Sequence, residues 1–169
     1  MELMINAAER RPPVRMTVRA LVMDPVSNMP VVILQDDDRS TFLPIWIGVC
    51  EANAISLVLE GVPTPRPMTH DLIRDLLGAT GFTVDHVFIH SLADSVFLAS
   101  IHLVNEAGDS REVDCRPSDA LALALRTNSA VLVDPDVLTR AVAAEQSQDE
   151  AIRSILERLR PEDLGEYEM

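Results

Sequence analysis

The feature that most constrains the fold is a short pattern that occurs twice, each time where a predicted strand is followed by a predicted helix. At positions 51–55 and 119–123 an acidic residue precedes alanines and branched apolar residues. Reading outward from both copies gives the same order of elements. The sequence therefore predicts an internal duplication of β3α2 units, with a carboxylate, Glu51 or Asp119, at the start of the first helix in each half. If a pseudo-twofold axis relates the halves, these two acids converge in one cleft.

The predicted fold class is α+β, with the duplicated units forming one compact domain over residues 14–143. Alternating apolar residues and turn residues predict strands, and apolar stripes at helical spacing predict helices. The first half, residues 14–82, has strands at 14–24, 29–35 and 41–47 and helices at 51–59 and from 69. The second half, residues 83–143, has strands at 83–91, 96–105, 111–115 and 131–133 and helices at 118–127 and 135–143. We expect a flexible tail at residues 1–13, and a linker with an acidic C-terminal helix at residues 144–169.

The size and charge of the chain limit its class and its partners. The chain has 169 residues, 47% of them hydrophobic, which is enough for one domain with a substantial core. It has no apolar run near the length of a membrane helix, and its start lacks the features of a signal peptide, so we expect a soluble cytoplasmic protein. The net charge is −13 and all 14 basic residues are arginine, which opposes nonspecific binding to nucleic acid. Aromatic residues make up only 4%, which disfavours a stacking platform for single strands.

The two cysteines, Cys50 and Cys115, each lie near the start of a predicted helix, at the end of the third strand of each half. They could approach one another and form a disulfide. The spacing matches no metal site, and we expect two buried free thiols, as in a reducing compartment.

The densest cluster of chemically useful side chains is the segment 66–71, which precedes and begins the second helix. Arg66 comes just before the exposed N–H groups of a helix start, where an anion is favoured, and His70 could act there as an acid or a base. A purely structural interpretation also fits, because Thr69 would cap the helix and Asp71 would complement its dipole.

A second arginine–proline pair precedes the first helix of the second half. Arg116 is followed by Pro117, by Ser118 as a predicted N-cap, and by Asp119. Two such corners, each beside an acid, would form matched sites for an anion. Alternatively, Arg116 would pair structurally with Asp119 or Glu51.

Acidic residues gather near these helix starts, at Glu51, Asp71, Asp114 and Asp119. Carboxylates that are brought close together either hold protons or bind a cation, and Mg²⁺ binds a few carboxylates plus water. Such an ion polarises phosphate and activates water in phosphoryl transfer. The alternative is that each carboxylate only stabilises its own helix.

Three motifs in this order resemble the bifunctional nuclease domain family. They are Leu43-Pro44-Ile45-Trp46-Ile47-Gly48 followed by Glu51-Ala52, then Gly61 with Arg66-Pro67-Met68-Thr69-His70-Asp71-Leu72, and then Arg116-Pro117-Ser118-Asp119-Ala120-Leu121-Ala122-Leu123-Ala124-Leu125-Arg126. The resemblance extends over residues 16–140. The chain departs from the family at Asp94-Ser95, where many members have Asp-Gly.

The resemblance implies a duplicated β3α2 fold, a homodimer, and nuclease activity on RNA and DNA. Carried over residue by residue, it marks the candidate site residues Glu51, Arg66, Thr69, His70, Asp71, Arg116, Ser118 and Asp119.

Two functions are therefore in competition. In the first, the chain is a metal-assisted phosphodiesterase. Its catalytic residues are Glu51, His70, Asp71 and Asp119, with Glu51 and Asp119 also holding Mg²⁺ or Mn²⁺. The substrate phosphate is bound by Arg66, Thr69, Arg116 and Ser118. In the second, the chain is a noncatalytic regulatory module, and its arginine–proline corners capture a small anion or an acidic partner. The charge favours the second and the resemblance favours the first.

Overall fold

In the computed structural model, which describes residues 11–145, seven strands form one sheet and four helices pack around it. The elements are β1 (Val14–Met23), β2 (Pro30–Asp36), β3 (Phe42–Trp46), α1 (Val49–Leu59), α2 (Thr69–Ala79), β4 (Phe82–Ala93), β5 (Val96–Asn105), β6 (Ser110–Cys115), α3 (Pro117–Thr127), β7 (Ala130–Val133) and α4 (Pro135–Glu145). The predicted α+β class and the single compact domain are confirmed.

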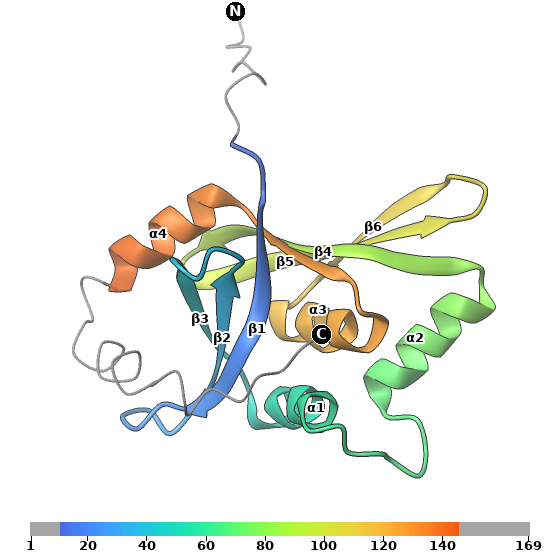
Figure 1. Ribbon diagram of the computed structural model, residues 1–169, viewed down its shortest axis with the longest axis horizontal. Helices are drawn as coiled ribbons and strands as arrows, with labels where there is room; N and C mark the ends of the chain where they lie inside the picture. Colours follow the sequence, from blue (N-terminus) through green and yellow to red (C-terminus); the bar gives the residue numbers. More distant parts are fainter. Residues whose placement is uncertain (1–10, 146–169) are drawn as a thin grey trace, which may run out of the picture.

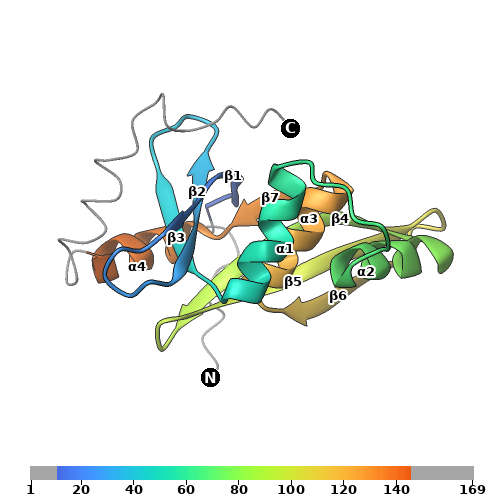
Figure 2. The same ribbon diagram turned by 90° about the horizontal axis from the view of Figure 1, so that it is seen from below.

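The sheet consists of two antiparallel meanders joined by a short central strand, in the order β3-β2-β1-β7-β4-β5-β6. β7 pairs antiparallel with β1 and parallel with β4. Strands β1–β3 run across the direction of β4 and β5 in both ribbon views, as expected for a strongly twisted sheet (Figures 1 and 2).

The helices are divided between two places on this sheet. α1 and α2 both pack against α3, and α3 packs against β4 and β5. α4 lies apart from these three, against β4 (Figures 1 and 2). The middle of α3 is buried on most sides and includes alanines at 120, 122 and 124, so neighbouring helices and strands can approach it closely. The three helix starts that carry the candidate residues thereby belong to one packed group.

One hydrophobic core holds the meanders and the helices together. Its largest fully buried side chains come from several elements and include Met16, Leu34, Leu43, Ile55, Ile89 and Leu121. A smaller cluster of Ala20, Val31 and Ile33 lies on β1 and β2. Burying such a side chain contributes about 1.5–3 kcal/mol, so the core fixes the positions of α1 and α3.

The structure differs from the sequence prediction in local details. The N-cap residues are Met68 and Arg116, one and two residues earlier than the predicted Thr69 and Ser118. For α3 the reason is Pro117, whose fixed φ and missing N–H suit the first helical position. α4 continues to Glu145, two residues into the predicted linker.

One helix is also less buried than predicted. The helix at 51–59 was expected to be buried on nearly all sides, but α1 buries only Ala52 and Ile55 fully, because α3 and β2 contact one side of it. The duplication itself stays a prediction. The tail at residues 1–10 and the C-terminal helix lie outside the described residues.

Candidate active site

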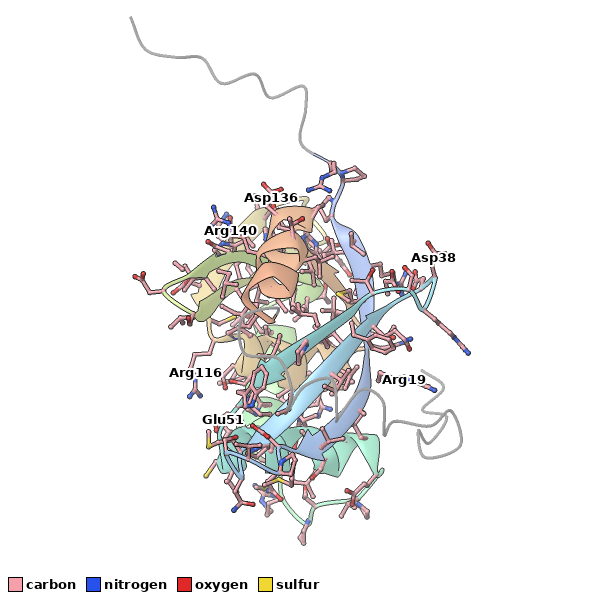
Figure 3. All side chains as sticks on the ribbon, turned by 90° about the vertical axis from the view of Figure 1, so that its left-hand side faces the viewer. Arg19, Asp38, Glu51, Arg116, Asp136 and Arg140 are labelled. Carbon is pink, nitrogen blue, oxygen red and sulfur yellow. The ribbon has the colours of Figure 1, made fainter. Side chains whose placement is uncertain are left out.

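Three helix starts carry the residues that meet at the candidate site. Glu51 lies in the first turn of α1, His70 in the first turn of α2, and Asp119 in the first turn of α3. Arg116 is the residue that precedes α3. In Figure 3 Glu51 and Arg116 lie close together on one flank of the molecule, far from Asp136 and Arg140. The predicted convergence of Glu51 and Asp119 is therefore observed, with Arg116 between them.

A continuous chain of polar contacts joins these four side chains. Asp119 Oδ1 lies 3.0 Å from His70 Nε2, and Asp119 Oδ2 accepts a hydrogen bond of 2.7 Å from Arg116 Nε. Arg116 Nη1 donates a hydrogen bond of 2.7 Å to Glu51 Oε1. Asp119 thus contacts an imidazole and a guanidinium at once, and Arg116 connects the acids of the two halves.

The burial of these groups differs in a way that bears on their chemistry. The His70 side chain is only 10% exposed, whereas the Arg116 side chain is 65% exposed. Ion pairs of so exposed an arginine contribute about 0–1 kcal/mol each. Arg116 can therefore exchange a carboxylate for a ligand oxygen at small cost, while His70 stays fixed by Asp119.

The charges around Asp119 favour its ionised form. Burial alone would raise the pKa of Asp119, but hydrogen bonds from Arg116 and His70 hold this pKa below its ordinary value. The hydrogen bond to Asp119 in turn raises the pKa of Arg116, with a further contribution from Glu51. Asp119 is therefore a stable anion, and it holds the imidazole through Nε2.

A cavity of about 600 Å³ opens at this cluster. Its walls come from α1 as far as Leu57, from the first turn of α2 and from the start of α3. Its polar lining includes Glu51, Thr69, His70, Arg116 and Asp119. This volume is within the range of ligand sites, about 300–1,000 Å³. A cationic side chain, a fixed histidine and two carboxylates face one hollow, which is a suitable set for binding a phosphate and moving a proton.

Gly48 makes room for the carboxylate of Glu51. A Cβ atom at position 48 would overlap Glu51 Oε2, although the backbone there has φ −75°, which any residue adopts. Glycine is favoured here because the Glu51 side chain folds back over the start of α1.

The remaining predicted residues lie in different places. Asp71 accepts hydrogen bonds from Met68 N at 2.9 Å and from Arg126 Nε at 2.8 Å, and it does not line the cavity. Arg66 is exposed, and its side chain forms no hydrogen bond or ion pair with the other residues in the range 11–145. Ser118 is buried and lines a neighbouring cavity. The structure thus gathers five of the eight candidates and leaves Arg66, Asp71 and Ser118 outside the hollow.

Sequence reasoning missed two residues near this site. The Arg126 side chain, only 4% exposed, ties α3 to the start of α2 through Asp71. The position of Arg126 in the last turn of α3 did not indicate this role, since its partner Asp71 is distant in the sequence. Cys50, predicted to be buried, is exposed and lines the cavity. Both cysteines are free, as predicted, and burial raises the pKa of the Cys115 thiol to about 11.

The donor set bears on the predicted metal. Among residues 11–145 no group of three or more His, Cys, Asp or Glu side chains is arranged to hold an ion. Mg²⁺ often binds one or two protein carboxylates and completes its shell with water and substrate oxygens. Glu51 and Asp119 match that chemistry once Arg116 releases them.

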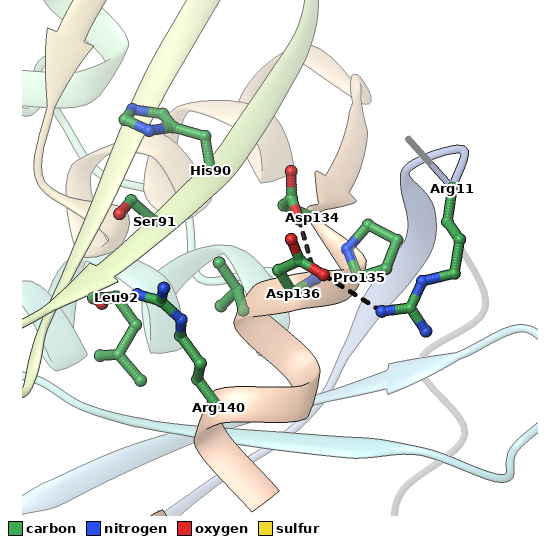
Figure 4. Close-up of a pocket in the computed structure, with 9 residues that line it drawn as sticks. Arg11, His90, Ser91, Leu92, Asp134, Pro135, Asp136 and Arg140 are labelled. Atoms are coloured by element: carbon green, nitrogen blue, oxygen red, sulfur yellow. Dashed lines mark hydrogen bonds and ion pairs between the residues drawn. The ribbon is translucent and has the colours of Figure 1, made fainter. Parts of the chain in front are cut away.

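A separate cavity of about 310 Å³ lies at the start of α4 and contains none of the predicted residues. Its charged groups already have partners, as Figure 4 shows for Arg11, which donates a hydrogen bond of 3.1 Å to Asp136. Arg140 donates to the Leu92 carbonyl, and Asp134 caps the helix through Asp136 N. These local contacts account for the charged residues at the start of α4. We therefore assign the candidate site to the cavity at His70 and Arg116.

No helix within the described residues has both the length and the apolar character needed to span a membrane.

The chain is similar to several known proteins. The chain matches the family model described as the bifunctional nuclease domain over residues 32–146. It is 39% identical to an uncharacterized protein of Mycobacterium tuberculosis over 132 residues, which are 77% of this chain and 78% of that protein. It is 24% identical to Bifunctional nuclease 2 of Arabidopsis thaliana over 62% of this chain and 32% of that protein. Bifunctional nuclease 2 of Oryza sativa subsp. japonica is 27% identical over 57% of this chain and 31% of its own length. The family match extends over more than half of the chain, and the chain therefore belongs to the bifunctional nuclease domain family.

Proposed function

We propose that the chain hydrolyses phosphodiester bonds of RNA and DNA at the cavity formed by the starts of α1, α2 and α3. The observation that carries this proposal is the contact of Asp119 with both His70 and Arg116. Family membership and the names of the plant relatives support the same reaction class.

The residues divide the chemistry between them. Arg116 moves from Glu51 to a phosphate oxygen, since a guanidinium binds phosphate as well as carboxylate. Asp119 fixes the ring of His70 through Nε2, which leaves Nδ1 as the nitrogen that transfers a proton. Glu51, freed from Arg116, accepts a proton from the attacking water, and Thr69 contributes a hydroxyl at the cavity wall.

Mg²⁺ or Mn²⁺ is part of the proposal. Glu51 and Asp119 would hold the ion, which when bound would polarise the phosphate and acidify a bound water.

The test is hydrolysis of labelled RNA and DNA by highly purified protein, with and without Mg²⁺ or Mn²⁺. Glu51→Gln and His70→Ala are expected to lose at least a hundredfold in rate. Asp75→Asn, an exposed acid of α2, is the matched control and keeps full activity. Melting temperatures separate a lost site from a lost fold. Activity that survives in both site variants would come from a contaminating nuclease and would refute the proposal.

A noncatalytic anion-binding module is the second candidate. The observation that favours it is that Arg116 already neutralises both acids of the cavity. In that case inorganic phosphate or a nucleotide binds, and Arg116→Ala abolishes this binding. RNA and DNA stay uncleaved with every variant and every metal.

We further propose that a second copy of the chain covers α2. The predicted apolar stripe of this helix is exposed at Leu72, Ile73 and Leu76, beside the neutral pair of Arg74 with Asp75. Two copies with a net charge of −13 each can approach most easily where a face is apolar and carries no net charge. Sedimentation should show a dimer that Leu76→Asp converts to a monomer and Val26→Asp, in the exposed β1–β2 turn, leaves intact. A monomeric wild type would contradict this.

Cytoplasmic location stays a prediction.

A further inference from the structure

A second cavity adjoins the candidate site and shares two of its residues. Its volume is about 430 Å³, and it lies between the end of β3, the tip of the β4–β5 hairpin and the start of α3. Glu51 and Arg116 line this cavity as well as the larger one. Their ion pair is therefore a wall common to two hollows, so a ligand in either one reaches the same guanidinium.

The lining of the second cavity is mostly apolar, as is that of the first, but only the second contains tryptophan and phenylalanine side chains. These are Trp46 and Phe97, and Val96 lies with them in the lining. Trp46 is the sole tryptophan of the chain, and Trp46 and Phe97 are two of its six aromatic residues. Although aromatic residues are scarce in this chain, two of them line the same cavity.

Trp46 is both exposed and fixed in orientation. It is 38% exposed, and its indole Nε1 donates a hydrogen bond of 3.1 Å to Asp24 Oδ2. Asp24 itself is buried. A fixed aromatic side chain loses little conformational entropy when a ligand packs against it. Val96, at the hairpin tip, is 58% exposed beside it.

We infer that this second cavity binds the nucleobase of a nucleotide whose phosphate is held by Arg116. The inference rests on the proposed function and names a subsite for it. An apolar hollow with aromatic residues, next to an exposed guanidinium, matches the two parts of a nucleotide, a flat base and an anionic phosphate.

The arrangement also defines the form of the substrate. A base that enters a hollow cannot remain paired and stacked inside a duplex. The strand therefore crosses Arg116 as a single strand, with one base in the cavity at Trp46 and the next nucleoside in the cavity at His70.

The single tryptophan provides a direct test of the subsite. Tryptophan-selective fluorescence is titrated with adenosine 5′-monophosphate and with ribose 5-phosphate, in EDTA. Adenosine 5′-monophosphate should quench the signal to saturation, and ribose 5-phosphate should bind at least tenfold more weakly because it lacks a base. Equal affinities, or no saturable quenching, would overturn the inference.

A pair of matched variants tests the location. Val96→Asp places a carboxylate in the cavity at Trp46 and should weaken nucleotide binding at least tenfold. Val62→Asp makes the same substitution at a site that is 44% exposed and does not line the cavity, and it should leave binding unchanged. Circular dichroism checks that both fold. An equal effect of the two variants would show that net charge, and not the subsite, governs binding.

Cys50 reports on the larger cavity. It is exposed, whereas Cys115 is half-buried with a raised pKa, so iodoacetamide reacts first with Cys50. A single-stranded oligonucleotide of six residues should protect Cys50 and quench Trp46, adenosine 5′-monophosphate should only quench, and a duplex of the same sequence should do neither. If the duplex protects Cys50 as well as the single strand does, the proposed path of a single strand across Arg116 is wrong.

These experiments separate the subsite from the reaction. Cleavage of RNA or DNA without quenching of Trp46 would leave the proposed nuclease and remove the subsite. Quenching without cleavage under any metal condition would leave a nucleotide-binding groove and remove the nuclease.

Discussion

At the scale of single residues, Asp119 and Asp71 have different roles, although each lies in the first turn of a helix. Asp119 faces the cavity and contacts His70 and Arg116. Asp71 faces α3, where its carboxylate pairs with Arg126. The first aspartate organises the site, and the second holds α2 in the place from which His70 reaches it.

The pair of Asp71 with Arg126 predicts a specific dependence of stability on pH. Burial opposes ionisation of Asp71, but hydrogen bonds from Met68 N and Arg126 hold its pKa below the ordinary value. A depressed pKa in the folded state adds stability above the unfolded pKa, about 3.9, and this stability is lost as the pH falls further. Asp71→Asn should therefore lower the free energy of unfolding at pH 7 by about 3 kcal/mol, with the difference shrinking below pH 4.

Urea denaturation between pH 3 and pH 8 measures this difference. Asp75→Asn, an exposed acid on the same helix, is the control and should change stability by less than about 1 kcal/mol. An offset for Asp71→Asn that stays constant across the whole pH range would contradict the ionic explanation.

Gly48 gives a second prediction at this scale. In Gly48→Ala the new methyl group displaces the Glu51 carboxylate and separates it from Arg116. Cleavage should fall at least about tenfold, since small misplacements of catalytic groups are costly. Stability should stay equal or rise by about 0.4–1 kcal/mol, because the backbone angle suits alanine. Gly78→Ala, whose new Cβ would meet no atom within 4 Å, should keep full activity in the same assay.

At the scale of elements, the hairpin between β4 and β5 carries a local strain. Asp94 and Ser95 have φ values of 49° and 64°, as in the two-residue hairpin turns that favour glycine at the second position. Ser95→Gly should remove the crowding of the serine Cβ and raise the melting temperature, with a gain of about 0.5–1 kcal/mol. A lower melting temperature in calorimetry would show that the serine side chain has a stabilising contact instead.

The elements also show which features a sequence determines locally. Strands and hairpins were predictable because alternation and turn residues such as those after Met23 act over a few positions. The meeting of Glu51 and Asp119 followed from the repeated pattern. The exposure of Leu72 and Leu76 could not be predicted, since helical spacing tells which residues share a face and not what covers it.

Two further features of the site depended on tertiary structure. Arg66 lies in the connection before α2, and no local rule gives the direction in which such a loop leaves the fold. The partner of Asp71 is 55 residues away at Arg126, so no spacing motif could indicate it.

At the scale of the whole molecule, the charge limits how nucleic acid can bind. The net charge of −13 repels a polyanion, and Arg116 is the arginine that lines both cavities of the site. The slope of log K against log salt is about −0.7 for each phosphate contact on a single strand. We therefore predict a slope near −0.7 for a six-residue strand in sodium chloride with EDTA. A slope of about −3 or steeper would mean at least four contacts and a basic surface elsewhere.

The central strand β7 has a consequence for how the protein is made. It begins at Ala130, yet it pairs with β1 at Val14–Met16 and with β4. The ribosome releases the meander β1–β3 long before β7, the strand that joins it to the meander β4–β6. Until that segment emerges, β1 is an open edge of the nascent chain, so this is the interval in which the chain is most prone to wrong pairing and most in need of a chaperone.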